Sequence, residues 1–156
     1  MARMLPLSNQ CRNPARRTPL MISCKLNDIA AVRCQIKMGG SIEHRDNRGR
    51  TALYRAAKAG NVEITQELVD AGADITAQTN VNRESPLFIA CLCNNVECAR
   101  LLLREQKRQC AANPSLLEAF CNMRSVDGWD PVMAAAVIGC VVSGGVSVAR
   151  VHAMLT

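Results

Sequence analysis

The chain has 156 residues, of which 49% are hydrophobic, 21% are charged and only 3% are aromatic. This composition excludes a disordered or collagen-like chain and predicts one soluble domain whose core is built from small aliphatic side chains. The formal net charge of +6 arises near one end, because residues 1–60 contain twelve basic and three acidic side chains, a balance that favours acidic partners.

Residues 1–17 are predicted to form a basic, flexible lead. The segment contains four arginines and no acidic residue, and Pro6 and Pro14 interrupt any amphipathic helix that a targeting peptide would need. The nine cysteines of the chain include no Cys-x-x-Cys pair, and the N-terminus does not read as a secretory signal. We therefore expect reduced thiols in the cytoplasm, with the nucleus as the alternative, and no bound metal.

Three segments after the lead line up with one another. They read TPLMISCKLNDIAAV from Thr18, TALYRAAKAGNVEIT from Thr51 and SPLFIACLCNNVECA from Ser85, at spacings of 33 and 34 residues. A shorter match, DPVMAAAVIG, begins at Asp130. Self-similarity at such a period predicts a repeat architecture in which neighbouring units bury a continuous core.

This unit resembles the ankyrin repeat, which carries a Thr-Pro-Leu-His-x-Ala signature at the start of the first of two helices. The second repeat fits this pattern best, through Asp46, Gly49, Thr51, Leu53, Ala56, Ala57 and Gly60. The resemblance implies an all-α ankyrin-repeat solenoid of about four stacked helix-turn-helix repeats with β-turn loops. The repeat domain would span residues 18–156, with repeats near 18–50, 51–84, 85–126 and 127–156.

Helix boundaries are predicted by residue types that recur at fixed positions. Thr18-Pro19 and Ser85-Pro86 predict helix starts, because the hydroxyl accepts a hydrogen bond from a free backbone N–H and proline lacks a donor that would go unpaired there. The first helix of each repeat is expected to end at a left-handed residue, and these positions hold Asn27, Gly60, Asn94 and Gly139. Cys24 and Cys91 are interpreted as replacements for alanine between closely packed helices.

The chain departs from the repeat pattern at several places. Gln35 stands where a leucine is expected, and Arg83 stands where the loop pattern has a glycine. In the third repeat, residues 104–126 are predicted to form a long loop insertion that contains a short helix. The fourth repeat ends in a helix without an obvious polar cap, which indicates either a degenerate end or a piece of a longer array.

No catalytic constellation occurs in the sequence. Motifs of serine hydrolases, nucleotide-binding loops and zinc proteases are absent, and thiol chemistry would have to come from the cluster of Cys91, Cys93 and Cys98. The uncharged stretch 132–149 is close to the length of a membrane span, but its glycines and serines argue against one. We therefore expect a non-catalytic protein with no cofactor, no small-molecule substrate and no membrane insertion.

The resemblance also implies where a partner binds, because ankyrin-like stacks use a concave face made of loop tips and the exposed side of each first helix. The predicted partner-binding residues are mostly basic in the first two repeats and apolar in the last two: Arg17, Lys25, Arg48, Arg50, Tyr54, Arg55 and Lys58, then Leu92 and Trp129. This face suits an acidic protein segment with a hydrophobic anchor. The alternatives are a binder of nucleic acid or another polyanion, which is disfavoured by the sparse basic residues, and a regulatory fragment of a larger ankyrin-containing protein.

Overall fold

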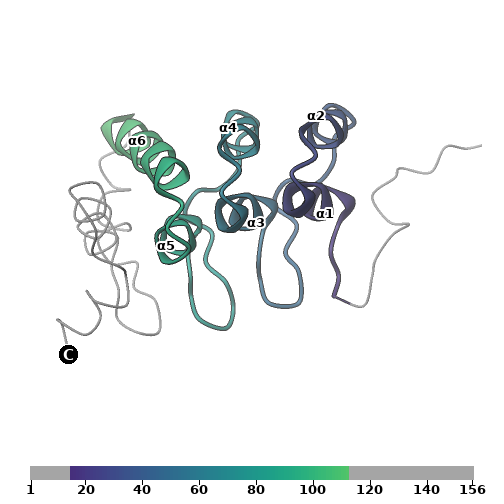
Figure 1. Ribbon diagram of the computed structural model, residues 1–156, viewed down its shortest axis with the longest axis horizontal. Coiled ribbons are helices and arrows are strands. Elements are labelled where there is room, and N and C mark those ends of the chain that lie inside the picture. Colours follow the sequence, from purple (N-terminus) through teal and green to yellow (C-terminus); the bar gives the residue numbers. More distant parts are fainter. Residues whose placement is uncertain (1–14, 113–156) are drawn as a thin grey trace, which may run out of the picture.

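The computed structural model describes residues 15–112 and shows six α-helices there (Figure 1). They come in three consecutive pairs: α1 (Pro19–Leu26) with α2 (Ile29–Lys37), α3 (Ala52–Ala59) with α4 (Val62–Asp70), and α5 (Pro86–Leu92) with α6 (Val96–Ala112). No strand occurs among the described residues. Most of the predicted lead and the whole of the predicted fourth repeat lie outside them.

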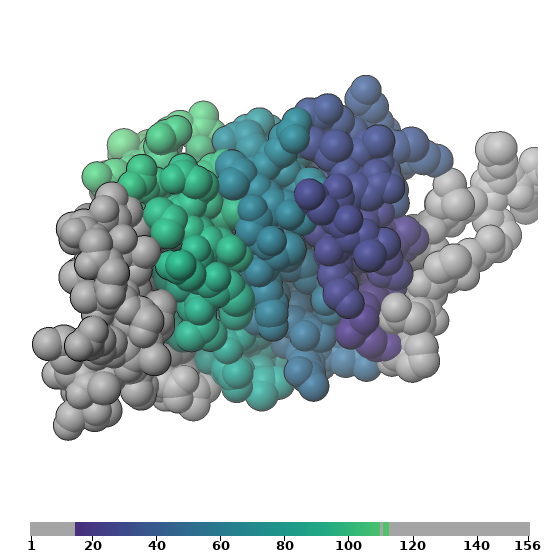
Figure 2. Space-filling view, viewed as in Figure 1, coloured from purple at the N-terminus to yellow at the C-terminus, as the bar shows by residue number. Residues whose placement is uncertain are grey.

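The three pairs stack into two layers (Figure 1). Helices α1, α3 and α5 lie side by side in one layer, and α2, α4 and α6 form the other. The loops that join successive pairs project beyond the layer of first helices, on the same side of the stack. In the space-filling view the pairs pack directly against one another (Figure 2). The predicted all-α stack of helix-turn-helix repeats is thereby confirmed.

Small side chains fill the space between neighbouring first helices. Ala56 and Ala57 on α3, Ala90 on α5 and Cys24 on α1 are completely buried, which lets the helix backbones approach closely. Cys24 occupies the position that Ala57 holds in the next repeat, so it packs as the alanine that it replaces. The second layer supplies larger buried aliphatic side chains, namely Val32, Ile64, Leu68 and Leu102.

Hydroxyl side chains start all three first helices. Each hydroxyl oxygen accepts a hydrogen bond from the backbone N–H three residues later. The distance is 3.3 Å from Met21 N to Thr18 Oγ1, and it is 3.2 Å at both Thr51 and Ser85. The two predicted starts, at Thr18 and Ser85, are therefore confirmed. Each cap satisfies a backbone N–H that has no partner inside the helix.

A left-handed residue follows each first helix, as predicted. Asn27, Gly60 and Asn94 have φ angles of 60°, 78° and 58°, and this conformation turns the chain directly into the second helix of the pair. Asparagine and glycine tolerate it better than other residues. Gly139, the fourth position of this kind, lies outside the described residues.

An asparagine just before the second helix ties each later repeat to the one before it. Asn61 Nδ2 donates a hydrogen bond to the Cys24 carbonyl at 2.9 Å. Asn95 Nδ2 donates to the carbonyls of Ala57 at 2.8 Å and Lys58 at 3.0 Å. These carbonyls belong to the last turn of the preceding first helix, where carbonyl groups lack α-helical partners. Each asparagine therefore satisfies one helix end and holds two repeats in register.

The loops account for the change of repeat spacing from 33 to 34 residues. Before α3, the Asp46 N–H donates to the Arg50 carbonyl and closes a three-residue turn. Before α5, the Thr79 N–H donates to the Glu84 carbonyl and closes a four-residue turn. The additional residue is thus absorbed in the turn, and α5 keeps its place in the stack.

The turn residue two positions before each capping residue is left-handed. Arg16, Gly49 and Arg83 have φ angles of 52°, 74° and 53°. Arg83, which stands where the sequence pattern expects a glycine, therefore adopts the glycine conformation in spite of its side chain. The register survives this departure because the turn fixes the backbone, at a cost of about 1–2 kcal/mol for a residue with a Cβ.

Helix α6 is longer than the sequence predicts. It runs from Val96 to Ala112, so the beginning of the predicted loop insertion at 104–126 is helical, and this part of the prediction is wrong. Its sequence there, REQKRQCAA, is rich in strong helix formers. Glu105 and Arg108 add an ion pair at 2.7 Å on the same helix face. Residues 113–126 lie outside the described residues.

Gln35 on α2 forms a polar contact at a position where the other repeats are apolar. Its Nε2 donates to Ser23 Oγ at 3.1 Å, but its buried Oε1 has no hydrogen-bond partner. The equivalent residues in the next two repeats are Leu68 and Leu102, both buried. The departure noted in the sequence is therefore a local weakness in the first repeat.

We expect Gly60→Ala to lower the free energy of unfolding by about 3 kcal/mol, because left-handed strain adds to the displacement of a hydrogen-bonded side chain. A Cβ built on Gly60 would lie 2.7 Å from Asn95 Oδ1. Gly72, with φ 87° and nothing within 4 Å of an added Cβ, is the matched control. Gly72→Ala should cost only the strain, about 1–2 kcal/mol.

Urea denaturation of both variants measures this difference. Equal losses in Gly60→Ala and Gly72→Ala would contradict the role assigned to Asn95. In an Asn95→Ala background, Gly60→Ala should cost less than it does in the wild type, because the clash is already removed.

We expect the double replacement Ser23→Ala with Gln35→Leu to raise the free energy of unfolding by about 1 kcal/mol, since it exchanges a half-satisfied buried polar pair for the apolar pair of the other repeats. Thermal unfolding followed by circular dichroism would report it. Ser23→Ala alone should destabilise, because it leaves Gln35 Nε2 without its acceptor. A double variant less stable than the wild type would show that the polar pair is favourable.

Candidate functional site

The candidate site is the face that was predicted to be concave, which consists of the loop tips and the exposed side of α1, α3 and α5. Lys25 on α1, Lys58 on α3 and Arg48 in the loop before α3 are exposed. Leu92, at the end of α5, is 50% exposed, and Leu26, at the end of α1, is 69% exposed. Arg17 is partly exposed beside the start of α1.

One row of equivalent positions precedes the capping residues of the three first helices. It contains Arg17, Arg50 and Glu84. The row is therefore basic in the first two repeats and acidic in the third. Along the stack, the sign of the charge changes between α3 and α5.

A second row lies near the ends of the same helices. It contains Lys25, Lys58 and Leu92, so this row changes from basic to apolar at the same repeat. Only the second row changes from basic to apolar, whereas the first changes from basic to acidic. Trp129, which was predicted to continue the apolar end, lies outside the described residues.

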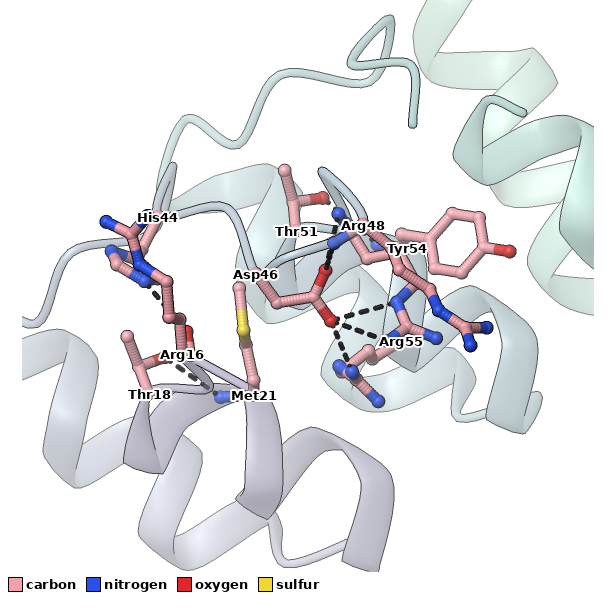
Figure 3. Close-up of polar contacts among 10 residues, drawn as sticks. Arg16, Thr18, Met21, His44, Asp46, Arg48, Thr51, Tyr54 and Arg55 are labelled. Carbon is pink, nitrogen blue, oxygen red and sulfur yellow. Dashed lines mark hydrogen bonds and ion pairs between the residues drawn. The ribbon is translucent and has the colours of Figure 1, made fainter. Parts of the chain in front are cut away.

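Asp46 is the centre of a charge network beside this face (Figure 3). Its side chain is completely buried. Oδ1 accepts the backbone N–H groups of Arg48 at 2.9 Å and Arg50 at 3.0 Å. Oδ2 accepts from Arg50 Nε at 2.9 Å and from Arg55 Nη2 at 2.6 Å. The carboxylate thereby fixes the turn before α3 and joins that turn to the helix.

The hydrogen bonds to Asp46 keep it ionised. Burial by itself would raise the pKa of the Asp46 carboxyl, but the hydrogen bonds from Arg50, Arg55 and the Arg48 backbone outweigh burial and hold the pKa at about 2. A carboxylate that accepts several charge-assisted hydrogen bonds is stabilised in its charged form. Asp46 therefore remains an anion throughout the physiological pH range.

The structure gives Arg50 and Arg55 a different environment from that of the exposed basic residues. Their side chains are 17% and 10% exposed and both pair with Asp46, whereas Lys25, Arg48 and Lys58 are exposed to solvent. The predicted basic residues thus fall into two groups, an exposed group and a group held by an internal carboxylate. Asp46 was identified from the sequence only as a match to the repeat pattern and not as a partner of these arginines.

Tyr54 is 4% exposed and lies between two repeats. Its hydroxyl donates to Glu84 Oε2 at 2.6 Å, so it links α3 to the loop before α5. Burial, the hydrogen bond to Glu84 and the negative charge of Glu84 all raise the pKa of Tyr54. Tyr54 therefore contributes little exposed area to this face, and its hydroxyl already donates a hydrogen bond within the protein. Glu84 was predicted to lie on this face but was not among the predicted partner-binding residues.

Metal binding and thiol reactivity can be assessed within the described residues. Within residues 15–112, no group of three or more His, Cys, Asp or Glu side chains could hold a metal ion. Burial raises the pKa of the Cys91 thiol to about 12 and also raises that of Cys98, which makes both poor nucleophiles. No helix in this part of the chain is long and apolar enough to cross a membrane. The weak span candidate at 132–149 lies outside the described residues.

Comparison with known protein families matches most of the chain. Residues 2–79 match the family described as ankyrin repeats in three copies, and residues 82–117 match the family described as ankyrin repeat.

Three of the similar curated proteins come from two mammals and a plant. Ankyrin repeat domain-containing protein 63 from Mus musculus is 35% identical over 102 residues, which cover 63% of this chain and 26% of that protein. Ankyrin repeat and SOCS box protein 11 from Homo sapiens is 32% identical, over 70% of this chain and 31% of that protein. E3 ubiquitin-protein ligase XBAT32 from Arabidopsis thaliana is 30% identical, over 89% and 27%. The chain thus spans about a quarter to a third of these relatives.

We expect Asp46→Asn to lower the free energy of unfolding by about 3 kcal/mol, because it leaves two largely buried arginines without their counterion. Stability should also respond to acid. Because folding lowers the pKa of Asp46 from 3.8 to about 2, its contribution is fully present above about pH 4 and is lost as the pH falls towards 2.

Urea denaturation at pH 7 and at several values down to pH 2 measures both effects. The wild type should lose stability faster than Asp46→Asn below about pH 4, so that the two converge. Asp70→Asn, at an exposed position of α4, is the control with the same change of charge. If Asp46→Asn were no less stable at pH 7 than Asp70→Asn, the central role of Asp46 would be disproved.

Proposed function

Because this chain belongs to the ankyrin repeat family, whose repeats are generally modules for protein–protein interaction, we propose that it binds an acidic segment of a partner protein on its concave face. The proposal is that of a non-catalytic interaction module. Three exposed cations, Lys25, Arg48 and Lys58, would attract the segment, and the exposed Leu92 would accept an apolar side chain.

The observation that carries this proposal is the change of both residue rows at the same repeat. Arg17 and Arg50 give way to Glu84, and Lys25 and Lys58 give way to Leu92. A bound segment is thereby oriented, because acidic residues are favoured opposite the first two repeats and an apolar or basic residue opposite the third. Charge complementarity of this kind increases the association rate and selects the partner.

Two of the similar proteins suggest a wider setting. Their names describe a SOCS box protein and an E3 ubiquitin-protein ligase, and the match to this chain covers 31% and 27% of their lengths. We extend the proposal by placing this chain in the same position, as the interaction part of a larger protein or assembly. A cytoplasmic location, with the nucleus as the alternative, would suit its free thiols at Cys24, Cys34, Cys91, Cys93 and Cys98.

We expect the triple reversal of Lys25, Arg48 and Lys58 to glutamate to abolish recovery of the partner while leaving the fold intact. All three side chains are exposed, and surface substitutions of this kind change stability by less than about 0.5 kcal/mol each. Arg50 is not included, since a glutamate there would face the buried Asp46. The measurement is affinity purification from cell extract, with mass spectrometry of the recovered proteins.

A second triple reversal, of Lys37, Arg100 and Lys107, serves as the control. These residues are exposed on α2 and α6 in the outer layer and carry the same total charge. Partners lost only from the concave-face variant would support the proposal. Equal recovery by both variants would refute it, and recovery dominated by nucleic acid from the wild type would favour the polyanion alternative.

A further inference from the structure

The tips of the loops form a row along one edge of the stack (Figure 1). The Asn47 N–H donates to the Ala15 carbonyl at 3.3 Å, and the Asn80 N–H donates to the Arg48 carbonyl at 3.0 Å. Backbone hydrogen bonds therefore hold each tip beside the next. The described residues of this tip row are 15–16, 47–49 and 80–83.

The tip row is basic in all three repeats. Each tip contains one exposed arginine, namely Arg16, Arg48 and Arg83, and none of the described tip residues is acidic. Within the described part of the chain, none of these three arginines forms an ion pair. The row differs in this respect from the two rows on the first helices, which lose their positive charge in the third repeat.

The acidic residues that flank the tips in the sequence are bound elsewhere. Asp46 is buried and holds Arg50 and Arg55. Glu84 accepts hydrogen bonds from the Tyr54 hydroxyl and from Asn82 Nδ2. The three tip arginines are therefore available to an anion outside the protein.

Val81 adds an aliphatic side chain to the same row. It is 63% exposed and belongs to the four-residue turn before α5, which is one residue longer than the turn before α3. Turns favour glycine, proline, asparagine, aspartate and serine, so an exposed valine gives this turn no local advantage. An aliphatic side chain beside guanidinium groups is instead the combination that is stable at the boundary between lipid headgroups and acyl chains.

We propose that the tip row docks on an anionic lipid surface. Arg16, Arg48 and Arg83 contact the phosphate and carboxylate groups of the lipids, and Val81 enters the interface beside them. The negative potential of an anionic leaflet attracts such a row, and a guanidinium group binds phosphate through parallel N–H donors. Nucleic acid would also attract the arginines, but its phosphate backbone offers nothing to an exposed valine.

This contact is peripheral and weak by itself. A basic side chain close to an anionic bilayer strengthens partitioning by about fivefold, and the row provides three. Lys25, Lys58 and Leu92, near the other ends of the first helices, lie outside the tip row. The tip row is therefore a second binding surface beyond the proposed contact with a protein segment, and it would place that contact close to a membrane.

The test is co-sedimentation of the full chain with vesicles of equal parts phosphatidylserine and phosphatidylcholine at low salt, with pure phosphatidylcholine vesicles as the reference. The double variant Arg16→Gly with Arg83→Gly removes two charges from the row. Glycine suits the left-handed backbone at both positions, and Gly49 already holds the equivalent position in the second repeat. We expect binding to weaken by about 25-fold, which is fivefold for each charge.

Two further variants separate the row from general charge effects. Arg100→Gln with Lys107→Gln removes the same charge from exposed positions of α6 and should leave vesicle binding nearly unchanged. Val81→Thr keeps the branched shape but adds a hydroxyl group, and it should weaken binding by about threefold to fivefold because less apolar surface enters the interface. Circular dichroism verifies that each variant is folded.

Binding to the phosphatidylserine vesicles alone, reduced in the two tip variants and not in the α6 variant, supports the proposal. Equal sedimentation with both vesicle types, or equal losses in the tip and α6 double variants, would overturn it. So would a Val81→Thr variant that binds as the wild type does, or a short DNA duplex that binds more tightly than the vesicles through Arg16 and Arg83. Because Arg16, Arg83 and Val81 are absent from the triple reversal of Lys25, Arg48 and Lys58, failure here leaves the co-purification result standing.

Discussion

Contact between small side chains on neighbouring first helices determines the rest of this structure. Where α1 meets α3 and α3 meets α5, alanine and cysteine side chains are buried without exposure, so the helix backbones lie close together. Because each pair of helices buries its core only against its neighbours, the repeats are stable as a stack and not singly. The stack also positions the loops. Residues that lie one repeat apart in the sequence therefore occupy equivalent places on the face formed by the first helices and the loop tips.

Polar contacts between repeats set the register within which this packing occurs. Asn61 and Asn95 bond the carbonyl groups at the end of the preceding first helix, where the chain also needs its left-handed turn. The two requirements meet at Gly60, whose missing side chain leaves room for Asn95. One glycine thus serves both a helix end and a contact between repeats, which is why its replacement has a larger effect than strain alone would predict.

The basic charge of the first two repeats is organised by a single buried anion. Without Asp46, Arg50 and Arg55 would be flexible surface cations, whereas with it they are oriented and largely removed from solvent. The first two repeats therefore carry two forms of positive charge, namely guanidinium groups held by a buried carboxylate and the exposed side chains of Lys25, Arg48 and Lys58. The first provides directional hydrogen bonds, and the second acts at longer range and is more easily screened by salt.

The local features of the fold could be read from the chain alone. Starts at Thr18 and Ser85 and left-handed ends at Asn27, Gly60 and Asn94 are each decided by a few adjacent residues, and the period of 33 or 34 residues predicts the stack. The length of α6 was missed because the match to the repeat pattern stops near residue 104, and the helix was expected to stop there too. The residues that follow are strong helix formers, and α6 continues through them to Ala112.

What the sequence by itself determined is the kind of repeat and the starts and left-handed ends of its first helices, because these depend on short-range patterns. Only the tertiary structure decided which basic residues are exposed and which are paired. Asp46 meets Arg55, and Tyr54 meets Glu84, through contacts between a loop and a helix. A charge count cannot assign such pairs, because the distance between two charges in space is fixed by how the loops pack on the stack.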